Sequence, residues 1–171
     1  LKTEVFGTKM DMPIFLSPTA MQSLYHPDGD KASARAAEKF GTIYSMSTMA
    51  SFSIEEIANL SSGPKIFQLY IHKDQSITND LIDRCKRANF NGMCITVDTI
   101  VAGNRERDHR TGFTTPPKFT LDSLLSFAMR PQWVFNYFTH KKFELANLKD
   151  KVDKGTNIAQ SVMGYINEQY D

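Results

Sequence analysis

The sequence is short of the features that mark several classes of protein. It has only two cysteines, Cys85 and Cys94, which provide neither a disulfide framework nor a metal-binding spacing. Its 20 basic and 19 acidic residues leave a net charge of +1, which argues against a broad nucleic-acid-binding surface. No apolar run approaches the roughly 20 residues of a membrane-spanning helix. We therefore expect no disulfide framework, no resident metal and no nucleic-acid partner.

What is present is typical of a globular chain. The 171 residues are enough for one domain, and 41% hydrophobic and 23% charged residues are ordinary proportions. Cys85 and Cys94 lie in apolar periodic segments, so we expect both to be buried free thiols. The chain begins at Leu1 without a secretory signal pattern, and we expect it to be one part of a longer protein.

Apolar segments alternate with helical patterns along the first hundred residues. We predict strands at 14–16, 43–45, 65–70 and 93–97, and helices at about 30–40, 53–60 and 77–88. This alternation is typical of a parallel sheet with right-handed crossovers and with strands buried on both faces. A doubly wound sheet and an eight-stranded barrel both have this alternation of strands and helices. A barrel needs about 250 residues, so in that case the chain holds about half of one.

Local signals mark the ends of individual helices. Gly41 stands where a helix-terminating glycine is expected after the first helix. Ser53 and Glu56 have the spacing of a capping box at the start of the second. The third helix has an apolar face formed by Ile77, Leu81, Cys85 and Ala88.

The regular alternation stops after the fourth strand. Residues 103–117 are polar without a clear period, Thr120 can cap a short helix through Ala128, and 132–138 is rich in aromatic residues. A last helical pattern covers 158–169. Long excursions of this kind usually have a function.

The aromatic stretch, which Lys141 and Lys142 follow, has two interpretations of equal weight. In one, it contacts a membrane surface through its aromatic side chains. In the other, it forms a helical hairpin that packs on its own domain or on another subunit.

Polar residues gather where three of the predicted strands end. Gln68 and Tyr70 lie on one face of their strand, Asp98 directly follows the next strand, and 17–22 follows the first. In parallel α/β folds, the carboxyl ends of the strands hold the active site. The pattern therefore predicts one site built from several βα units.

At these strand ends the sequence resembles the FMN-dependent α-hydroxy acid dehydrogenase/oxidase family. The resemblance covers nearly the whole chain, and the segment 114–148 is most similar to the L-lactate dehydrogenase branch. The matching motifs are Ser17-Pro18-Thr19-Ala20-Met21-Gln22, Ser47, Phe67-Gln68-Leu69-Tyr70, Thr96-Val97-Asp98-Thr99, and Gly103 with Arg105, Glu106 and Asp108.

The resemblance implies an α/β fold that is a partial (β/α)8 TIM barrel, with about the first four βα units and a long loop excursion after the fourth strand. Residues 1–171 are then part of a single FMN-binding barrel domain whose N-terminal section and C-terminal half are absent. The family's catalytic histidine, a flavin-contacting lysine and a substrate-binding arginine belong to the absent part. The histidines that are present do not occupy the catalytic-histidine motif, and they are His26, His72, His109 and His140.

The residues that the resemblance assigns to FMN are Pro18, Thr19, Ala20, Ser47, Gln68 and Thr96. An amide side chain can pair with both donors and acceptors, which suits Gln68 to the edge of a flavin ring. Each assignment has a structural alternative. Gln68 can be satisfied by neighbouring backbone, Thr96 can be an ordinary strand residue, and Ser47 and the Pro18 loop can be plain turns.

Three further residues resemble the family's substrate and catalytic groups. Tyr70 corresponds to a tyrosine that bonds the substrate hydroxyl, and Arg105 to an arginine that meets a carboxylate at the pocket rim. Asp98 corresponds to the carboxylate that orients the catalytic histidine. The alternatives are a buried aromatic side chain for Tyr70, a surface ion pair for Arg105 and a loop cap for Asp98.

The implied activity is the FMN-dependent oxidation of a small (S)-2-hydroxy acid, L-lactate first, to the 2-oxo acid. A quinone, a cytochrome or oxygen would reoxidise the flavin. We expect a homo-oligomer at full length and a cytoplasmic location, with peripheral contact at the inner face of a membrane if the aromatic stretch binds lipid. The alternatives are an isomerase on a related flavin barrel and a non-catalytic fragment or binding module.

Overall fold

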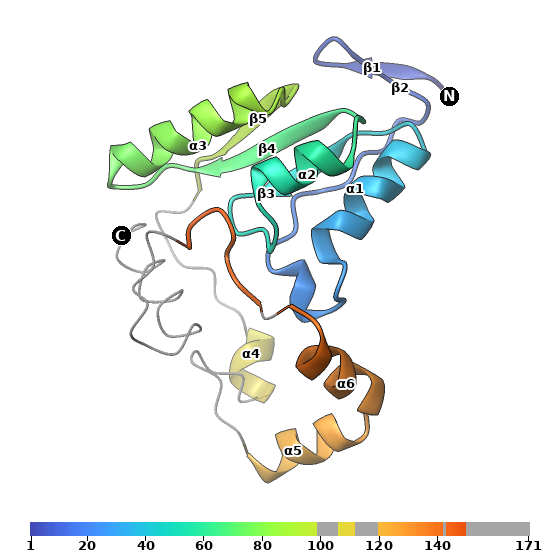
Figure 1. Ribbon diagram of the computed structural model, residues 1–171, viewed down its shortest axis with the longest axis vertical. Helices are drawn as coiled ribbons and strands as arrows, with labels where there is room; N and C mark the ends of the chain where they lie inside the picture. The colour runs from blue at the N-terminus through green and yellow to red at the C-terminus, as the bar shows by residue number, and fades with distance from the viewer. Residues whose placement is uncertain (99–105, 112–119, 142, 150–171) are drawn as a thin grey trace.

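The computed structural model describes residues 1–98, 106–111, 120–141 and 143–149. A parallel sheet lies between the short β1–β2 hairpin at one end of the molecule and helices α4, α5 and α6 at the other (Figure 1). The strands are β1 (Thr3–Val5), β2 (Thr8–Met10), β3 (Tyr44–Ser47), β4 (Lys65–Tyr70) and β5 (Gly92–Thr96). The helices are η1 (Gln22–Leu24), α1 (Gly29–Lys39), α2 (Ile54–Leu60), α3 (Gln75–Arg87), α4 (Glu106–Thr111), α5 (Leu121–Ala128) and α6 (Pro131–Thr139).

The predicted parallel α/β arrangement is confirmed. The sheet has the order β3-β4-β5, and its register pairs Ser47 with Gln68 and Tyr70 with Thr96. The predicted strand at 14–16 is reduced to one parallel bridge between Leu16 and Tyr44, and Ile14 and Phe15 are exposed. The described sheet is open rather than closed into a barrel.

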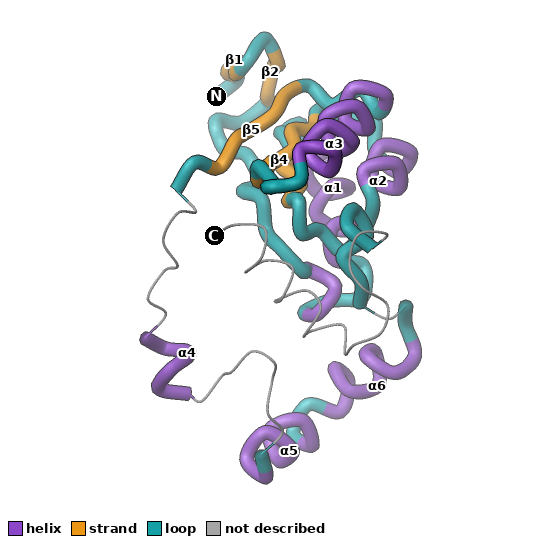
Figure 2. Tube along the Cα trace, turned by 90° about the vertical axis from the view of Figure 1, so that its left-hand side faces the viewer, coloured by secondary structure: helices purple, strands orange, loops and turns teal. Residues whose placement is uncertain are grey.

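The two faces of the sheet have different partners. Helices α1, α2 and α3 lie on one side of the strands (Figure 2). Phe67 and Leu69 of β4 point to this side and pack with Ile57 of α2 and Leu81 of α3 in the main core. Because side chains alternate along a strand, Gln68 and Tyr70 belong to the opposite face. The helices therefore cover the apolar face, and the polar residues share the other one.

Two expectations about burial are wrong for β5. Met93 and Ile95 are 38% and 52% exposed, so this strand is not buried on both faces. Cys94 is also exposed, whereas Cys85 of α3 is buried as expected. These side chains are exposed because β5 is the edge strand of the described sheet and pairs only with β4. Burial raises the pKa of the Cys85 thiol to about 12.

The local helix signals are confirmed. Ser53 and Glu56 form a reciprocal capping box at the start of α2, with bonds of 3.1 and 2.9 Å. Gly41 adopts a positive φ of 62° directly after α1, and the N–H of Thr42 donates to the Ala37 carbonyl. Thr120 caps α5 as predicted.

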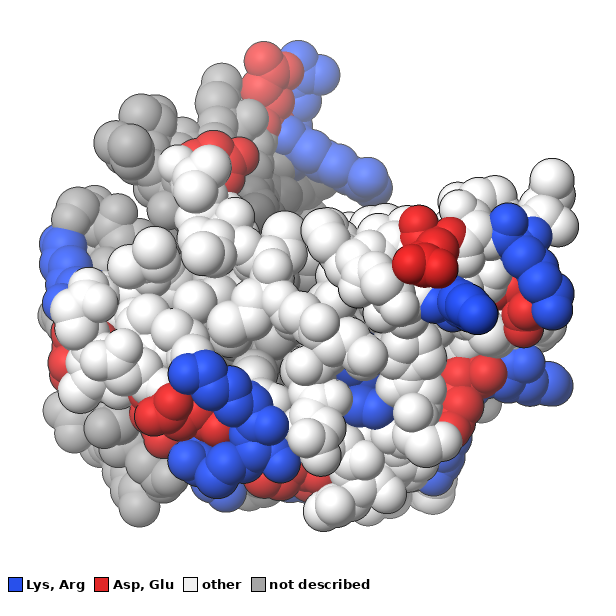
Figure 3. Space-filling model, turned by 90° about the horizontal axis from the view of Figure 1, so that it is seen from above, with Lys and Arg blue, Asp and Glu red and all other residues white. Residues whose placement is uncertain are grey.

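The N-terminal hairpin was not expected from the sequence. Phe6 and Gly7 both adopt positive φ, which suits a tight turn between β1 and β2. Met10 packs with Ile43 and Ile66 at the amino ends of the parallel strands. On the face of the molecule that Figure 3 shows, acidic and basic side chains are interspersed rather than gathered into one patch.

The excursion contains helices α4, α5 and α6, of which α4 was not predicted. Trp133 of α6 stacks on Phe127 of α5 with ring centroids 5.3 Å apart, so α5 and α6 form a hairpin. The indole N–H of Trp133 donates to the Leu24 carbonyl at 2.9 Å, which attaches the hairpin to η1. The predicted helix at 158–169 and Lys142 lie outside the described residues.

After α6 the chain returns to the core. Leu145 and Leu148 are buried, and the N–H of Ala146 donates to the Ala50 carbonyl at 3.3 Å. None of the helices in the described part of the chain is both long and apolar enough to cross a bilayer.

Candidate functional site

The carboxyl ends of β3, β4 and β5 bring three of the predicted residues together. Gln68 is buried, and its Nε2 donates to Thr96 Oγ1 at 2.7 Å. Its Oε1 accepts from Ser47 Oγ and from the Thr48 N–H, both at 3.3 Å. The register explains this cluster, because Ser47 pairs with Gln68 and Thr96 lies two residues beyond Cys94, the partner of Gln68.

Thr48 is a site residue that the sequence reasoning missed. It is fully buried, and its hydroxyl donates to the Gln68 carbonyl at 2.7 Å and accepts from the Tyr70 N–H at 3.2 Å. This side chain therefore continues the hydrogen bonding between β3 and β4 beyond the end of the regular ladder. The hydroxyl residues Ser45, Ser47 and Thr48, which stand close together in the sequence, were the available signal.

The loop that contains Pro18, Thr19 and Ala20 lies next to the end of β3. The N–H of Met21 donates to the Met49 carbonyl at 3.0 Å, and Met21 has a positive φ of 56°. Pro18 and Ala20 are half-buried and Thr19 is exposed. The loop is thus held beside the strand ends by backbone contacts and keeps part of its surface open.

Of the three substrate and catalytic candidates, Tyr70 and Asp98 lie among the described residues. Tyr70 is half-buried on the same face of β4 as Gln68. Asp98 follows β5 and is exposed, so the described fold imposes no burial cost on its carboxylate. Arg105 lies outside the described residues. The structure therefore groups Tyr70 with Gln68 on one face of β4.

His72 lies just behind Tyr70 and is almost fully buried. Burial lowers the pKa of its imidazole, and a hydrogen bond to the Tyr70 backbone opposes that shift. The backbone N–H of His72 donates to Thr78 Oγ1 at 3.0 Å, which joins the end of β4 to α3. These contacts make His72 part of the structure that supports the end of β4.

The donor set at the strand ends fits a flavin ring edge. Gln68 Nε2 uses one of its two hydrogens on Thr96, and the Thr96 hydroxyl keeps its own proton to donate. The Gln68 amide is also bonded to Ser47, Thr48 and Thr96. A purely structural role for Gln68 would account for these bonds equally well. Within the described ranges, no group of three His, Cys, Asp or Glu could hold a metal ion.

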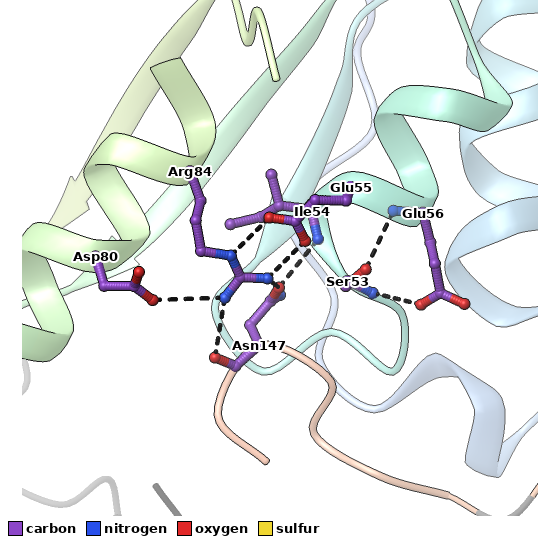
Figure 4. Close-up of polar contacts among 7 residues, drawn as sticks. All are labelled: Ser53, Ile54, Glu55, Glu56, Asp80, Arg84 and Asn147. Atoms are coloured by element: carbon purple, nitrogen blue, oxygen red, sulfur yellow. Dashed lines mark hydrogen bonds and ion pairs between the residues drawn. The ribbon is translucent and has the colours of Figure 1, made fainter. Parts of the chain in front are cut away.

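A separate cluster of charged residues lies on the helix side of the sheet. Arg84 of α3 makes a bidentate pair with Glu55 of α2 and also contacts Asp80 and Asn147 (Figure 4). The Arg84 bonds lower the pKa of Glu55 to about 2. A cavity of about 460 Å³ borders these residues. The cluster joins α2, α3 and the 143–149 segment.

Comparison with known proteins gives one consistent family. The family model of FMN-dependent dehydrogenases matches residues 1–170. Glycolate oxidase 1 of Zea mays is 46% identical over 121 residues, which are 71% of this chain and 33% of that protein. Glycolate oxidase of Spinacia oleracea is 44% identical over 121 residues, with the same coverage.

Solved structures agree with the sequence comparison. The monotopic membrane protein (S)-mandelate dehydrogenase has a TM-score of 0.88 at 30% identity, and the match covers 100% of this chain and 45% of that one. A lactate oxidase of Pediococcus acidilactici has a TM-score of 0.63 at 37% identity, over 75% of this chain and 36% of that one. The chain spans about a third of the length of the glycolate oxidases that it matches. It belongs to the FMN-dependent dehydrogenase family.

Proposed function

We propose that this chain forms part of a flavoenzyme that oxidises a small (S)-2-hydroxy acid to the 2-oxo acid. The observation that carries the proposal is the convergence of Ser47, Gln68 and Thr96 at the carboxyl ends of three adjacent strands. A polar cluster at this end of a parallel sheet is where α/β enzymes bind their ligands. The family is FMN-dependent, so we assign this cluster to the flavin.

Each FMN residue has a specific role in this proposal. Gln68 presents its amide to the pyrimidine edge of the flavin while Ser47 and Thr48 hold its oxygen. Thr96 directs its free hydroxyl proton to the same edge. The backbone of the Pro18–Thr19–Ala20 loop approaches the ring from the neighbouring strand end. FMN, when bound, accepts the two electrons that leave the substrate.

Tyr70, Asp98 and Arg105 act on the substrate in this scheme. Tyr70 projects from the Gln68 face and donates its phenol proton to the oxygen of the hydroxy acid. Arg105 binds the substrate carboxylate, for which a guanidinium has matching geometry. Asp98 orients the histidine that removes the substrate proton and stabilises its charged form.

L-lactate is the substrate that we propose first. The resemblance of 114–148 to lactate dehydrogenases supports it, and a lactate oxidase is among the similar structures. Glycolate and (S)-mandelate are direct competitors, because glycolate oxidases and mandelate enzymes also resemble the chain. A quinone, a cytochrome or oxygen is the proposed acceptor, and the protein is proposed to be a cytoplasmic homo-oligomer.

The experiment is anaerobic flavin reduction in the full-length protein, followed as loss of the oxidised flavin band. L-lactate, glycolate and (S)-mandelate are compared at saturation, and D-lactate is the stereochemical control. We expect reduction by the first three with L-lactate fastest. Asp98→Asn should slow reduction by about 100-fold, since general-base steps contribute on that order. Absence of reduction by every acid would refute the proposed reaction.

We also propose that residues 1–171 belong to a single FMN-binding barrel domain of (β/α)8 type. The parallel order β3-β4-β5 and the bridge at Leu16 support this arrangement, since one α-helix lies between each of these parallel segments and the next. The similarity to (S)-mandelate dehydrogenase over the whole chain supports it as well.

The α5–α6 hairpin is proposed to contact the surface of a membrane, at its inner face. Large apolar side chains on it are strongly exposed, among them Leu121, Met129 and Phe138 at 75% or more. Exposed apolar groups of this number mark interaction surfaces. The (S)-mandelate dehydrogenase that resembles the chain is itself described as a monotopic membrane protein.

A further inference from the structure

The carboxylate of Asp30 is completely buried near the start of α1, where it joins three parts of the fold. Its Oδ1 accepts from the hydroxyl of Tyr44 in β3, and its Oδ2 accepts from the N–H of Ser51, both at 2.9 Å. Burying a carboxylate is costly unless it is well bonded, and burial raises the pKa of this group. The position of Ser51 relative to α1 is therefore fixed by strong contacts.

Ser51 also forms a hydrogen bond with a second segment of the chain. Its Oγ accepts from the N–H of Ser23 in η1 at 3.1 Å. A further backbone bond, from Met21 to Met49, lies beside it at 3.0 Å. The hydrogen bonds from Asp30 through Ser51 to Ser23 thus connect α1 with the segments 47–52 and 17–24.

Both segments lead directly to the flavin-binding residues of the proposed function. Segment 47–52 begins at Ser47, which bonds to Gln68. Segment 17–24 contains the Pro18–Thr19–Ala20 loop. A shift of Ser51 would move both segments relative to Gln68, because the buried side chains around them leave little room for compensation.

We propose that Asp30 and Ser51 are positioning residues for the cofactor, which hold segments 17–24 and 47–52 in the arrangement that binds FMN. The inference rests on the proposed FMN site. Neither side chain is assigned to the flavin, so both act through the backbone of the two segments.

Ser61 provides a matched control at the other end of the sheet. It is buried like Ser51, with exposures of 4% and 3%, and its Oγ accepts from the Gly63 N–H at 3.2 Å. Ser61 precedes β4, and the hydrogen bonds found for it among the described residues join it to Glu38, Ile57, Gly63 and Lys65 rather than to either segment. Ser51→Ala and Ser61→Ala each remove one acceptor from a backbone N–H, so their general cost to folding should be alike.

The test compares Asp30→Ala, Ser51→Ala and Ser61→Ala in the full-length protein. Urea unfolding measures stability, and quenching of flavin fluorescence measures the Kd for FMN in the folded protein. We expect all three to be less stable. The Kd should rise about 10-fold in Asp30→Ala and about 3-fold in Ser51→Ala, since hydrogen bonds of this kind are worth factors of that size. Ser61→Ala should keep the parent Kd.

The outcomes separate this inference from the proposed function. A parent protein that binds no FMN refutes the proposed function and the inference with it. A parent that binds FMN, with Ser51→Ala and Ser61→Ala indistinguishable in Kd, overturns the inference alone. If Asp30→Ala does not fold, the two serine variants decide the question by themselves.

Discussion

Asn147 caps helix α2 from a distance of 93 residues along the chain. Its Oδ1 accepts a hydrogen bond from the N–H of Ile54, the first residue of α2, at 3.0 Å. The same oxygen accepts from Arg84 of α3 at 3.2 Å (Figure 4). One side chain therefore fastens the end of the excursion to two helices of the core.

Asn147→Ala should lower the free energy of unfolding by about 1–3 kcal/mol, because a buried helix N-terminus and Arg84 lose an acceptor. Urea denaturation of the full-length protein measures the change. Asn79→Ala, at an exposed position of α3, is the control and should change stability by less than about 0.5 kcal/mol. Equal effects of the two substitutions would show that the cap contributes nothing.

Gln68→Leu should weaken FMN binding by about 10-fold, since unpaired polar groups cost about 1–3 kcal/mol. The substitution removes the acceptor of Ser47 and Thr48 and the donor to Thr96. The Kd for FMN and the flavin midpoint potential are the measurements. Gln75→Leu, at an exposed position of α3, should change neither. A normal Kd and potential in Gln68→Leu would return Gln68 to a structural role.

The ion pair of Glu55 with Arg84 predicts a specific loss of stability in acid. Arg84 holds the pKa of Glu55 at about 2, below its usual 4.5. The contribution of the pair is therefore complete above about pH 4.5 and is lost as the pH falls to about 2. The Glu55 side chain is 51% exposed, so screening limits this contribution to about 0.5–1 kcal/mol.

The measurement is urea unfolding of the parent and Glu55→Gln between pH 2 and 6. We expect a constant difference in the free energy of unfolding above about pH 4.5 that shrinks towards zero near pH 2. Glu4→Gln, at an exposed position of β1, is the control substitution. A difference that stays constant down to pH 2 contradicts the assignment.

The apolar surface of the α5–α6 hairpin should bind lipid. Phe138→Ser should reduce flotation of the full-length protein with anionic vesicles by several-fold, because each buried aromatic side chain contributes about 1.5–3 kcal/mol. Phe6→Ser is a matched control, since Phe6 and Phe138 are 80% and 79% exposed, and the β1–β2 hairpin and α6 lie at opposite ends of the molecule (Figure 1). Parallel behaviour of the two variants would contradict a membrane site on the hairpin.

Features set by neighbouring residues were predictable from the sequence. The capping box of Ser53 and Glu56 and the positive φ of Gly41 depend on local geometry, and both are present. A gathering of polar side chains at the strand ends was expected from parallel strands that end at one edge, and Gln68 and Thr96 meet there. Ser47 was added to the site by the family resemblance alone. The assignment of the cluster to FMN came from the family resemblance rather than from these bonds.

Features set by distant contacts were not predictable. The buried pair of Asp30 and Tyr44 lies 14 residues apart, and nothing in the sequence marks either as paired. The hydroxyl residues near Thr48 were a signal in the sequence, but only the register shows that Thr48 bonds to the Gln68 backbone. Met93 and Ile95 read as buried strand residues, yet their exposure depends on what stands beside β5.

The bond between Trp133 and Leu24 gives the chain a built-in optical reporter. Trp133 is the one tryptophan in the sequence, and it lies in the excursion rather than in the core. Within this chain, indole emission therefore reports on the attachment of the α5–α6 hairpin and not on the sheet. A red shift without a change in far-UV circular dichroism would mean that the hairpin has left η1 while the rest of the fold is intact.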